Sequence, residues 1–137
     1  MSNKLLIAVV CSIVLTCWAD ANAQPADGSI STRACFGRVS KRCYIFSAER
    51  NSGVRYEIAR AHKGRLIQQT QLSEQQFTRL INLVSKMSAS SIQNRGACQN
   101  LVEIESFKTS ELEDVNTVCI PPALFNSAEE EMQNAIK

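Results

Sequence analysis

The clearest periodic pattern in the chain is a stripe of apolar residues spaced three and four positions apart between residues 72 and 88. Ser73 precedes the stripe, and Gln76 lies three residues after Ser73, which is the spacing of a capping box. One apolar side of such a segment must be buried against another element. The pattern therefore predicts an amphipathic helix over 72–88, packed on a sheet. The stripe consists of Phe77, Leu80, Ile81, Val84 and Met87.

Short alternating runs of apolar and polar residues predict strands on both sides of this helix. Four runs come before it and are separated by turn-forming residues, so they predict an antiparallel meander. Two further runs after it predict a hairpin. The predicted strands cover residues 34–39, 43–46, 54–59, 66–71, 101–107 and 115–120.

The end of the chain contains a second helix signal. Pro121 and Pro122 stop the last predicted strand, and Ser127 with Glu130 has capping-box spacing. We expect a short C-terminal helix from Ala128, with the acidic run 129–131 in its first turn, where the helix dipole favours negative charge. The fold class predicted is α+β, with a mostly antiparallel sheet, one packed amphipathic helix and this short helix.

The first 23 residues have the layout of a secretory signal peptide. Lys4 precedes an uncharged apolar run from Leu5 to Trp18, and small residues at 19–23 offer cleavage sites. The run is short for a membrane span. We expect cleavage before Gln24, a flexible leader over 24–33, a single domain over 34–137 without a transmembrane segment, and a periplasmic or secreted location. The alternatives are a retained N-terminal anchor and lipid attachment at Cys17, but Thr16 precedes Cys17 where lipoprotein signals place Gly, Ala or Ser.

Four cysteines remain after the predicted cleavage site, an even number that in an exported chain indicates disulfides. Each of two pairs brackets a predicted hairpin, so we predict the bonds Cys35–Cys43 and Cys98–Cys119. The chain has no C-x-x-C motif and one histidine, which gives no grounds for a zinc site. We expect neither a metal nor a cofactor.

Charge is unevenly distributed along the chain. Residues 24–65 hold nine basic and three acidic side chains, whereas residues 66–137 hold five basic and nine acidic ones. A basic first half can steer an acidic protein surface or a polyanion, although a solvated charged face on strands and turns is the favoured interpretation because the basic residues are spaced out. If the first half does bind a partner, we expect the contact surface at its hairpin turns, over 38–42, 50–53 and 62–65. The candidate contact residues are Arg38, Lys41, Arg42, Arg55, Arg60, His62 and Lys63.

Few residues suggest catalysis. His62 has no nucleophile or orienting acid that can be placed near it from sequence. Glu103 and Glu105 share one face of a predicted strand, which is either a carboxylate pair for glycoside hydrolysis or the wet face of a strand whose Val102 and Ile104 point inward. The wet-face interpretation is favoured, because alternation of polar and apolar residues is what a half-buried strand shows.

These observations favour a small exported binding protein without enzymatic activity, such as an inhibitor or an immunity-type partner of a hydrolase or toxin. The alternative function is binding of anionic envelope polymers, either glycans or lipid headgroups, through the basic meander. A hydrolase using Glu103 and Glu105 is the third hypothesis. We expect a protein partner and no nucleic acid, since an exported protein meets little of it.

Overall fold

The computed structural model describes residues 28–92 and 98–137. The predicted signal peptide, its cleavage site, Cys17 and residues 24–27 of the predicted leader lie outside the described residues. No helix within the described ranges combines the length and the apolar character that crossing a membrane requires.

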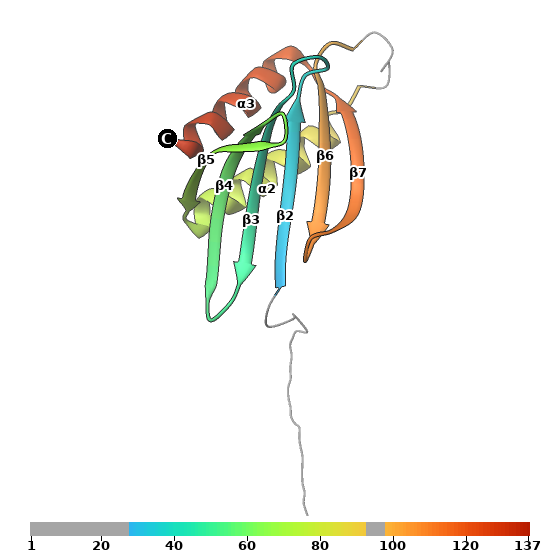
Figure 1. Cartoon of the computed structure of the whole chain (residues 1–137). Coiled ribbons are helices and arrows are strands. Elements are labelled where there is room, and N and C mark those ends of the chain that lie inside the picture. Colours follow the sequence, from blue (N-terminus) through green and yellow to red (C-terminus); the bar gives the residue numbers. More distant parts are fainter. Residues whose placement is uncertain (1–27, 93–97) are drawn as a thin grey trace, which may run out of the picture.

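Six strands form one antiparallel sheet in the order β5-β4-β3-β2-β6-β7 (Figure 1). The first four make the predicted meander, and β6 of the later hairpin pairs with β2, so that meander and hairpin share one sheet. The strands are β2 Gly28–Phe36, β3 Arg42–Arg50, β4 Val54–His62, β5 Arg65–Leu72, β6 Leu101–Lys108 and β7 Glu111–Cys119.

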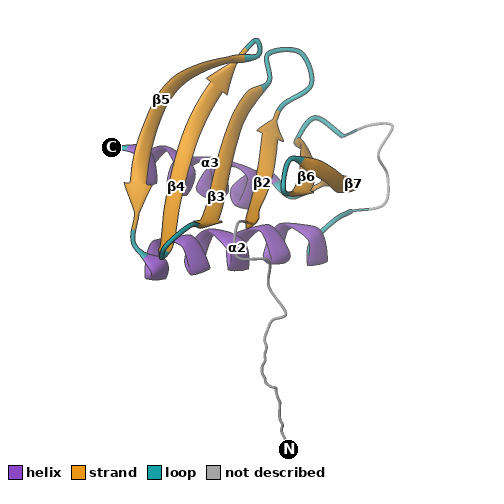
Figure 2. Cartoon of the chain, turned by 60° about the horizontal axis from the view of Figure 1, so that its bottom comes forward, coloured by secondary structure: helices purple, strands orange, loops and turns teal. Residues whose placement is uncertain are grey.

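Helices α2 (Glu74–Ala89) and α3 (Pro122–Ile136) lie on the same face of the sheet, as Figure 2 shows. The core fills the space between them and the sheet. It takes alternate residues from the strands, because successive strand side chains point to opposite faces. Its largest fully buried side chains are Phe36, Tyr44, Phe46, Ile58, Leu80, Met87, Ile120 and Met132.

The α+β class with an antiparallel sheet, two helices and two disulfides is confirmed. The start of α2 is also as predicted. Ser73 is its N-cap, its hydroxyl accepts from the backbone N–H of Gln76, and the Gln76 side chain accepts from the backbone N–H of Ser73.

The prediction of a short C-terminal helix beginning at Ala128 is wrong. Helix α3 has 15 residues and begins at Pro122, with Pro121 in the N-cap position. Proline suits the first helical position because its missing N–H would have no partner there anyway. Ser127 is therefore internal to the helix, and its hydroxyl donates to the carbonyl of Leu124 instead of capping. The acidic run 129–131 lies mid-helix, outside the first turn.

The prediction of a flexible leader over 24–33 is wrong for residues 28–33, which form the first two thirds of β2. This segment is rich in small polar residues and shows little apolar alternation. It is extended because β2 is central in the sheet and pairs with β3 on one side and β6 on the other. Pairing with two neighbours satisfies the backbone N–H and C=O groups of this segment. The segment is therefore a strand even though its side chains give only a weak strand pattern.

Both predicted disulfides are present. Cys35 and Cys43 face each other across β2 and β3, with their Cα atoms 4.0 Å apart. Cys98 and Cys119 are 6.0 Å apart and join the segment before β6 to the end of β7. Each bond therefore closes a hairpin at the end of the sheet that carries the β2–β3 turn.

Candidate functional site

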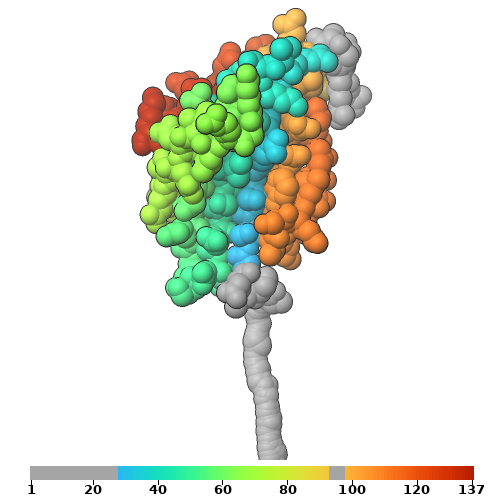
Figure 3. All heavy atoms as spheres, viewed as in Figure 1, coloured from blue at the N-terminus to red at the C-terminus, as the bar shows by residue number. Residues whose placement is uncertain are grey.

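The sheet face opposite the helices, here called the open face, is covered by none of the described helices (Figures 1 and 2). Its central rows mix small and large side chains: Ser31 pairs with Ser47, Ile45 lies between Arg33 and Ala59, and the Cys35–Cys43 disulfide follows. Figure 3 shows the central strands between the β4–β5 hairpin on one side and β6 and β7 on the other. The face is thus a broad surface on which no pair of carboxylates is enclosed.

Glu103 and Glu105 both lie on the open face of β6, while Val102 and Ile104 point into the core. Lys41 Nζ lies 3.3 Å from Glu103 Oε1, and Arg33 Nη1 lies 3.3 Å from Glu105 Oε1. Each carboxylate therefore faces a cation from the β2–β3 hairpin. The Glu103 side chain is 33% exposed, whereas the Glu105 side chain is 18% exposed and its Oε1 is buried without a hydrogen bond. Because each carboxylate is paired with its own cation on the face opposite the core, the arrangement supports the wet-face interpretation more clearly for Glu103 than for Glu105.

The predicted basic contact residues do not lie on a single surface. The β2–β3 turn, with Arg38 and Lys41, and the β4–β5 turn, with His62 and Lys63, lie at the same end of the sheet (Figure 1). Arg55 is at the start of β4, beside the β3–β4 turn at the opposite end. The three hairpin turns over 38–42, 50–53 and 62–65 are accordingly split between two ends of the molecule.

Several of these cations already have partners within the chain. The Arg38 guanidinium donates to the carbonyl of Cys98 at 2.8 Å, and Arg55 Nη1 lies 3.7 Å from Glu57 Oε2. Lys41 faces Glu103, and Arg42 is bound to Glu129. Four of the seven candidate contact residues thus have an acceptor within the described part of the chain.

Arg42 belongs to a polar cluster between β3 and α3. Its Nε and Nη2 both donate to the Glu129 carboxylate, the second at 2.9 Å to Oε1, and the buried Tyr44 hydroxyl donates to Oε2 at 3.2 Å. The hydrogen bond to Glu129 raises the pKa of Arg42, and burial is the main cause that raises the pKa of Tyr44. The sequence gives no signal for this cluster, because Glu129 lies more than 80 positions from Arg42 and Tyr44.

A cleft of about 510 Å³, here called the end cleft, opens at the end of the sheet that carries the β3–β4 turn. Its apolar lining comes from Ile30, Val54, Tyr56 and Phe77. The rings of Tyr56 and Phe77 pack with their centroids 4.9 Å apart. Ile30 is 50% exposed and Val54 47%, although both are on the strand face that elsewhere forms the core. The rim of the end cleft carries both signs of charge, from Arg50, Lys108, Glu74 and Glu113.

The end cleft exists because the strands extend past α2. Val54, Tyr56 and Ile58 alternate on one face of β4, as the sequence predicts, but only Ile58 is fully buried. Tyr56 is half-buried against Phe77 of α2, and Val54 lies beyond it. The alternation in the sequence could therefore identify the apolar face, but it could not show where the helix stops covering it.

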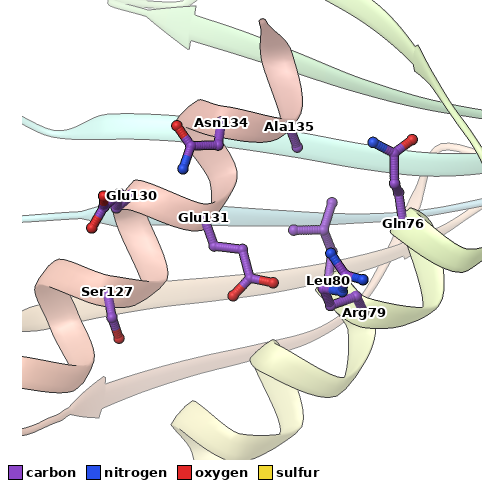
Figure 4. A pocket seen from close by; sticks show the side chains of 8 residues that line it. All are labelled: Gln76, Arg79, Leu80, Ser127, Glu130, Glu131, Asn134 and Ala135. Atoms are coloured by element: carbon purple, nitrogen blue, oxygen red, sulfur yellow. The ribbon is translucent and has the colours of Figure 1, made fainter.

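A second hollow, of about 450 Å³, lies between α2 and α3. Figure 4 shows Glu131 reaching from α3 toward the part of α2 that carries Arg79 and Leu80. Its lining is mainly polar, with Gln76 and Asn134 beside these residues. It offers fewer apolar contacts than the end cleft.

Within residues 28–92 and 98–137, no group of three His, Cys, Asp or Glu side chains is placed to hold a metal ion. The chain matches no protein-family model, and comparisons with curated proteins and with solved structures found no match. The functional argument therefore depends on the chain's own residues.

Proposed function

We propose that this chain is a small exported binding protein without enzymatic activity, of the inhibitor or immunity type, and that it holds a protein partner through the end cleft. The observation that carries the proposal is the apolar lining of this cleft, in which Ile30 is 50% and Val54 47% exposed. Large apolar side chains exposed together on a water-facing surface mark interaction sites more often than chance. A volume near 510 Å³ also lies within the range of pockets that enclose a side chain or small ligand.

The charges around the end cleft support a protein as the partner. Arg50 and Lys108 stand on the same rim as Glu74 and Glu113, so the rim has no excess of either sign. A polyanion would gain no net electrostatic attraction from such a rim. A protein segment with an apolar anchor and a mixed polar surround fits such a site, since interfaces place apolar anchors in the centre and polar groups at the rim.

The scaffold keeps the end cleft in a fixed shape. Its lining comes from five strands of one sheet, β2, β3, β4, β6 and β7, and from α2, which packs on the same core. Two disulfides close the hairpins at the far end. A surface that is already ordered loses less conformational entropy when it binds. We propose that the other end of the sheet, with exposed His62 and Lys63, assists by attracting the partner from a distance.

Binding of anionic envelope polymers is the less supported alternative. It requires free cations, whereas Arg38, Lys41, Arg42 and Arg55 each have a partner in the chain. Steep loss of polymer binding with salt, together with loss after neutralisation of Arg42, Arg55 and Arg60, would favour this alternative over a protein partner.

The proposal is tested by placing a photo-crosslinking phenylalanine analogue at position 54 in cells that export the protein. We expect a crosslinked species of one defined mass. The unmodified protein should co-purify with the same partner in fixed stoichiometry. Ile30→Glu combined with Val54→Glu should weaken capture at least about tenfold, because charges would have to be buried in the contact.

A matched control uses Leu112→Glu with Val115→Glu, two side chains of similar exposure on β7. This control should keep full capture, and both variants should show unchanged circular dichroism. Equal capture by the cleft variant and the wild type would show that the end cleft is not the contact surface.

A further inference from the structure

We propose that the outer edge of β7 binds an extended, basic segment of another protein as an added strand. This inference goes beyond the proposed function and does not depend on the end cleft. It begins from the position of β7, which ends the sheet and has no neighbouring strand on its outer side in the described part of the chain (Figure 1). An edge strand whose backbone groups face outward is a template for pairing with a further strand.

Contacts at the end of β7 identify its outward-facing backbone groups. The Cys119 N–H donates to Ser91 Oγ at 3.3 Å, and the Cys119 carbonyl accepts from the N–H of Ile92 at 2.6 Å. Cys119 therefore directs both of its groups away from β6. Alternate residues of a strand direct their N–H and C=O groups to the same side, so Thr117 and Val115 also present theirs outward. The chain itself thus bonds to this edge at Cys119, and the same edge continues through Thr117 and Val115.

The side chains of β7 indicate which partner strand fits this edge. Glu111, Glu113 and Asp114 lie within four residues, and all three are exposed. None of them forms an ion pair with another side chain of the described residues. Leu112 and Val115, on the same stretch of β7, are 52% and 48% exposed. The edge therefore offers unpaired negative charge together with apolar surface.

The two kinds of side chain lie on different faces of β7. Asp114 pairs with Ser106 of β6 on the face that the helices cover elsewhere, whereas Leu112 pairs with Phe107 on the open face. Strand side chains alternate between the faces, so a strand with alternating basic and apolar residues can place its cations beside the acidic side chains and its apolar groups beside Leu112. An acidic strand would be repelled on the first of these faces.

Charge complementarity also distinguishes β7 from the other edge of the sheet. The one charged residue of β5 is Arg65, so that edge has no acidic side chain for a basic segment. Acidic residues on an edge strand prevent pairing between two copies of the same edge, because like charges would meet. The β7 edge therefore selects a basic strand and excludes a second copy of itself.

The proposal is tested with a fluorescent synthetic peptide in which lysine and valine alternate, titrated with the exported, oxidised protein. Fluorescence anisotropy should give a Kd below about 1 mM that weakens as salt is added. In nuclear magnetic resonance spectra, the amide signals of Val115 and Thr117 should shift and exchange more slowly with solvent. A peptide with glutamate in place of lysine should not bind. A lysine–valine peptide with all backbone amides methylated should not bind either, because it cannot donate to the edge.

Reversing the charge of the edge should reverse its preference. Glu111→Lys with Asp114→Lys should abolish binding of the lysine–valine peptide and create binding of the glutamate–valine peptide. These substitutions spare Glu113, which also stands on the rim of the end cleft. Thr117→Pro should weaken binding of the lysine–valine peptide at least about tenfold, since it removes an outward N–H that an edge strand can lose without breaking the sheet.

The matched control is Gln69→Lys with Gln71→Lys on the β5 edge, which should leave binding of the lysine–valine peptide unchanged. Circular dichroism of every variant should match the wild type. A wild type that binds no peptide up to about 1 mM would overturn the proposal. Equal binding of the methylated peptide, or of the lysine–valine peptide by the charge-reversed variant, would also overturn it. Crosslinking at position 54 in the end cleft is measured separately and would be unaffected.

Discussion

At the scale of single residues, the contact between Arg42 and Glu129 matters most for how α3 is held against the sheet. The Glu129 residue is 8% exposed, and its carboxylate accepts from Arg42 twice and from Tyr44 once. A buried charge is tolerated when it is paired and its lone pairs are used. The cluster therefore fixes α3 against β3 at one orientation, which single hydrophobic contacts would not specify.

We predict that Arg42→Ala lowers the free energy of unfolding by roughly 2–3 kcal/mol, less than for a fully buried pair because Arg42 is about a third exposed. The loss arises because Glu129 stays buried without its cation. Chemical denaturation measures it. Arg42→Leu combined with Glu129→Leu should recover much of the loss, since no charge is then left unpaired.

The control for this prediction is Lys41→Ala. Its ion pair with Glu103 is exposed on both sides, so the change should cost at most about 1 kcal/mol. If Lys41→Ala and Arg42→Ala lowered the free energy of unfolding equally, burial of Glu129 would not be the cause of the loss.

At the scale of elements, the two helices begin in different ways. Helix α2 begins with a complete side-chain capping box, whereas α3 begins after two prolines with no side-chain cap. Sequence spacing identified the first and misplaced the second, because Ser127 and Glu130 have capping-box spacing but lie mid-helix. A proline pair that ends a strand also begins a helix if the chain turns directly onto the sheet.

The two serines provide a paired test. Ser73→Ala should destabilise the protein by about 1 kcal/mol, because the N–H of Gln76 loses its acceptor. Ser127→Ala should change stability by less than about 0.5 kcal/mol, since alanine has the higher helix propensity at an internal position. Urea denaturation of both variants measures the difference, and equal losses would show that the cap at Ser73 adds nothing.

At the scale of the whole molecule, the helices leave one sheet face and both sheet edges without a neighbour in the described chain. One helix layer covers enough of the sheet to form a single core, and the strands extend past it at the end cleft. The disulfides lie at the opposite end from this cleft. The molecule thus has one end held by covalent bonds and another that offers apolar surface.

Removing both disulfides should destabilise the protein by roughly 5–6 kcal/mol, because the two loops contribute about 2.5 and 3.3 kcal/mol in the chain-entropy account. Replacing Cys98 and Cys119 by alanine should cost more than replacing Cys35 and Cys43, since its loop spans 21 positions against 8. Guanidinium unfolding with and without a reductant measures these losses. Unfolding of the wild type that is insensitive to the reductant would contradict the prediction. As a control, the reductant should not change the stability of a variant that lacks all four of these cysteines.

Local signals in the sequence determined the elements whose stabilising contacts are close along the chain. The capping box of α2, the meander, the later hairpin and the pairing of the four cysteines all depend on neighbours within about 20 positions. Such contacts leave periodic or spaced patterns that can be recognised directly. The charge asymmetry was also visible, but the sequence could not show which cations are paired, because the partners of Arg38, Lys41 and Arg42 lie 60 to 87 positions away.

Tertiary structure alone decided the rest. The extent of β2 depended on pairing with β6, the role of Glu129 on Arg42 across 87 positions, and the end cleft on where α2 stops covering the strands. The sequence by itself determined which residues are apolar, where turns fall and which thiols can meet. Only the fold decided which of those apolar residues are covered, because burial is set by elements that are far apart in the chain.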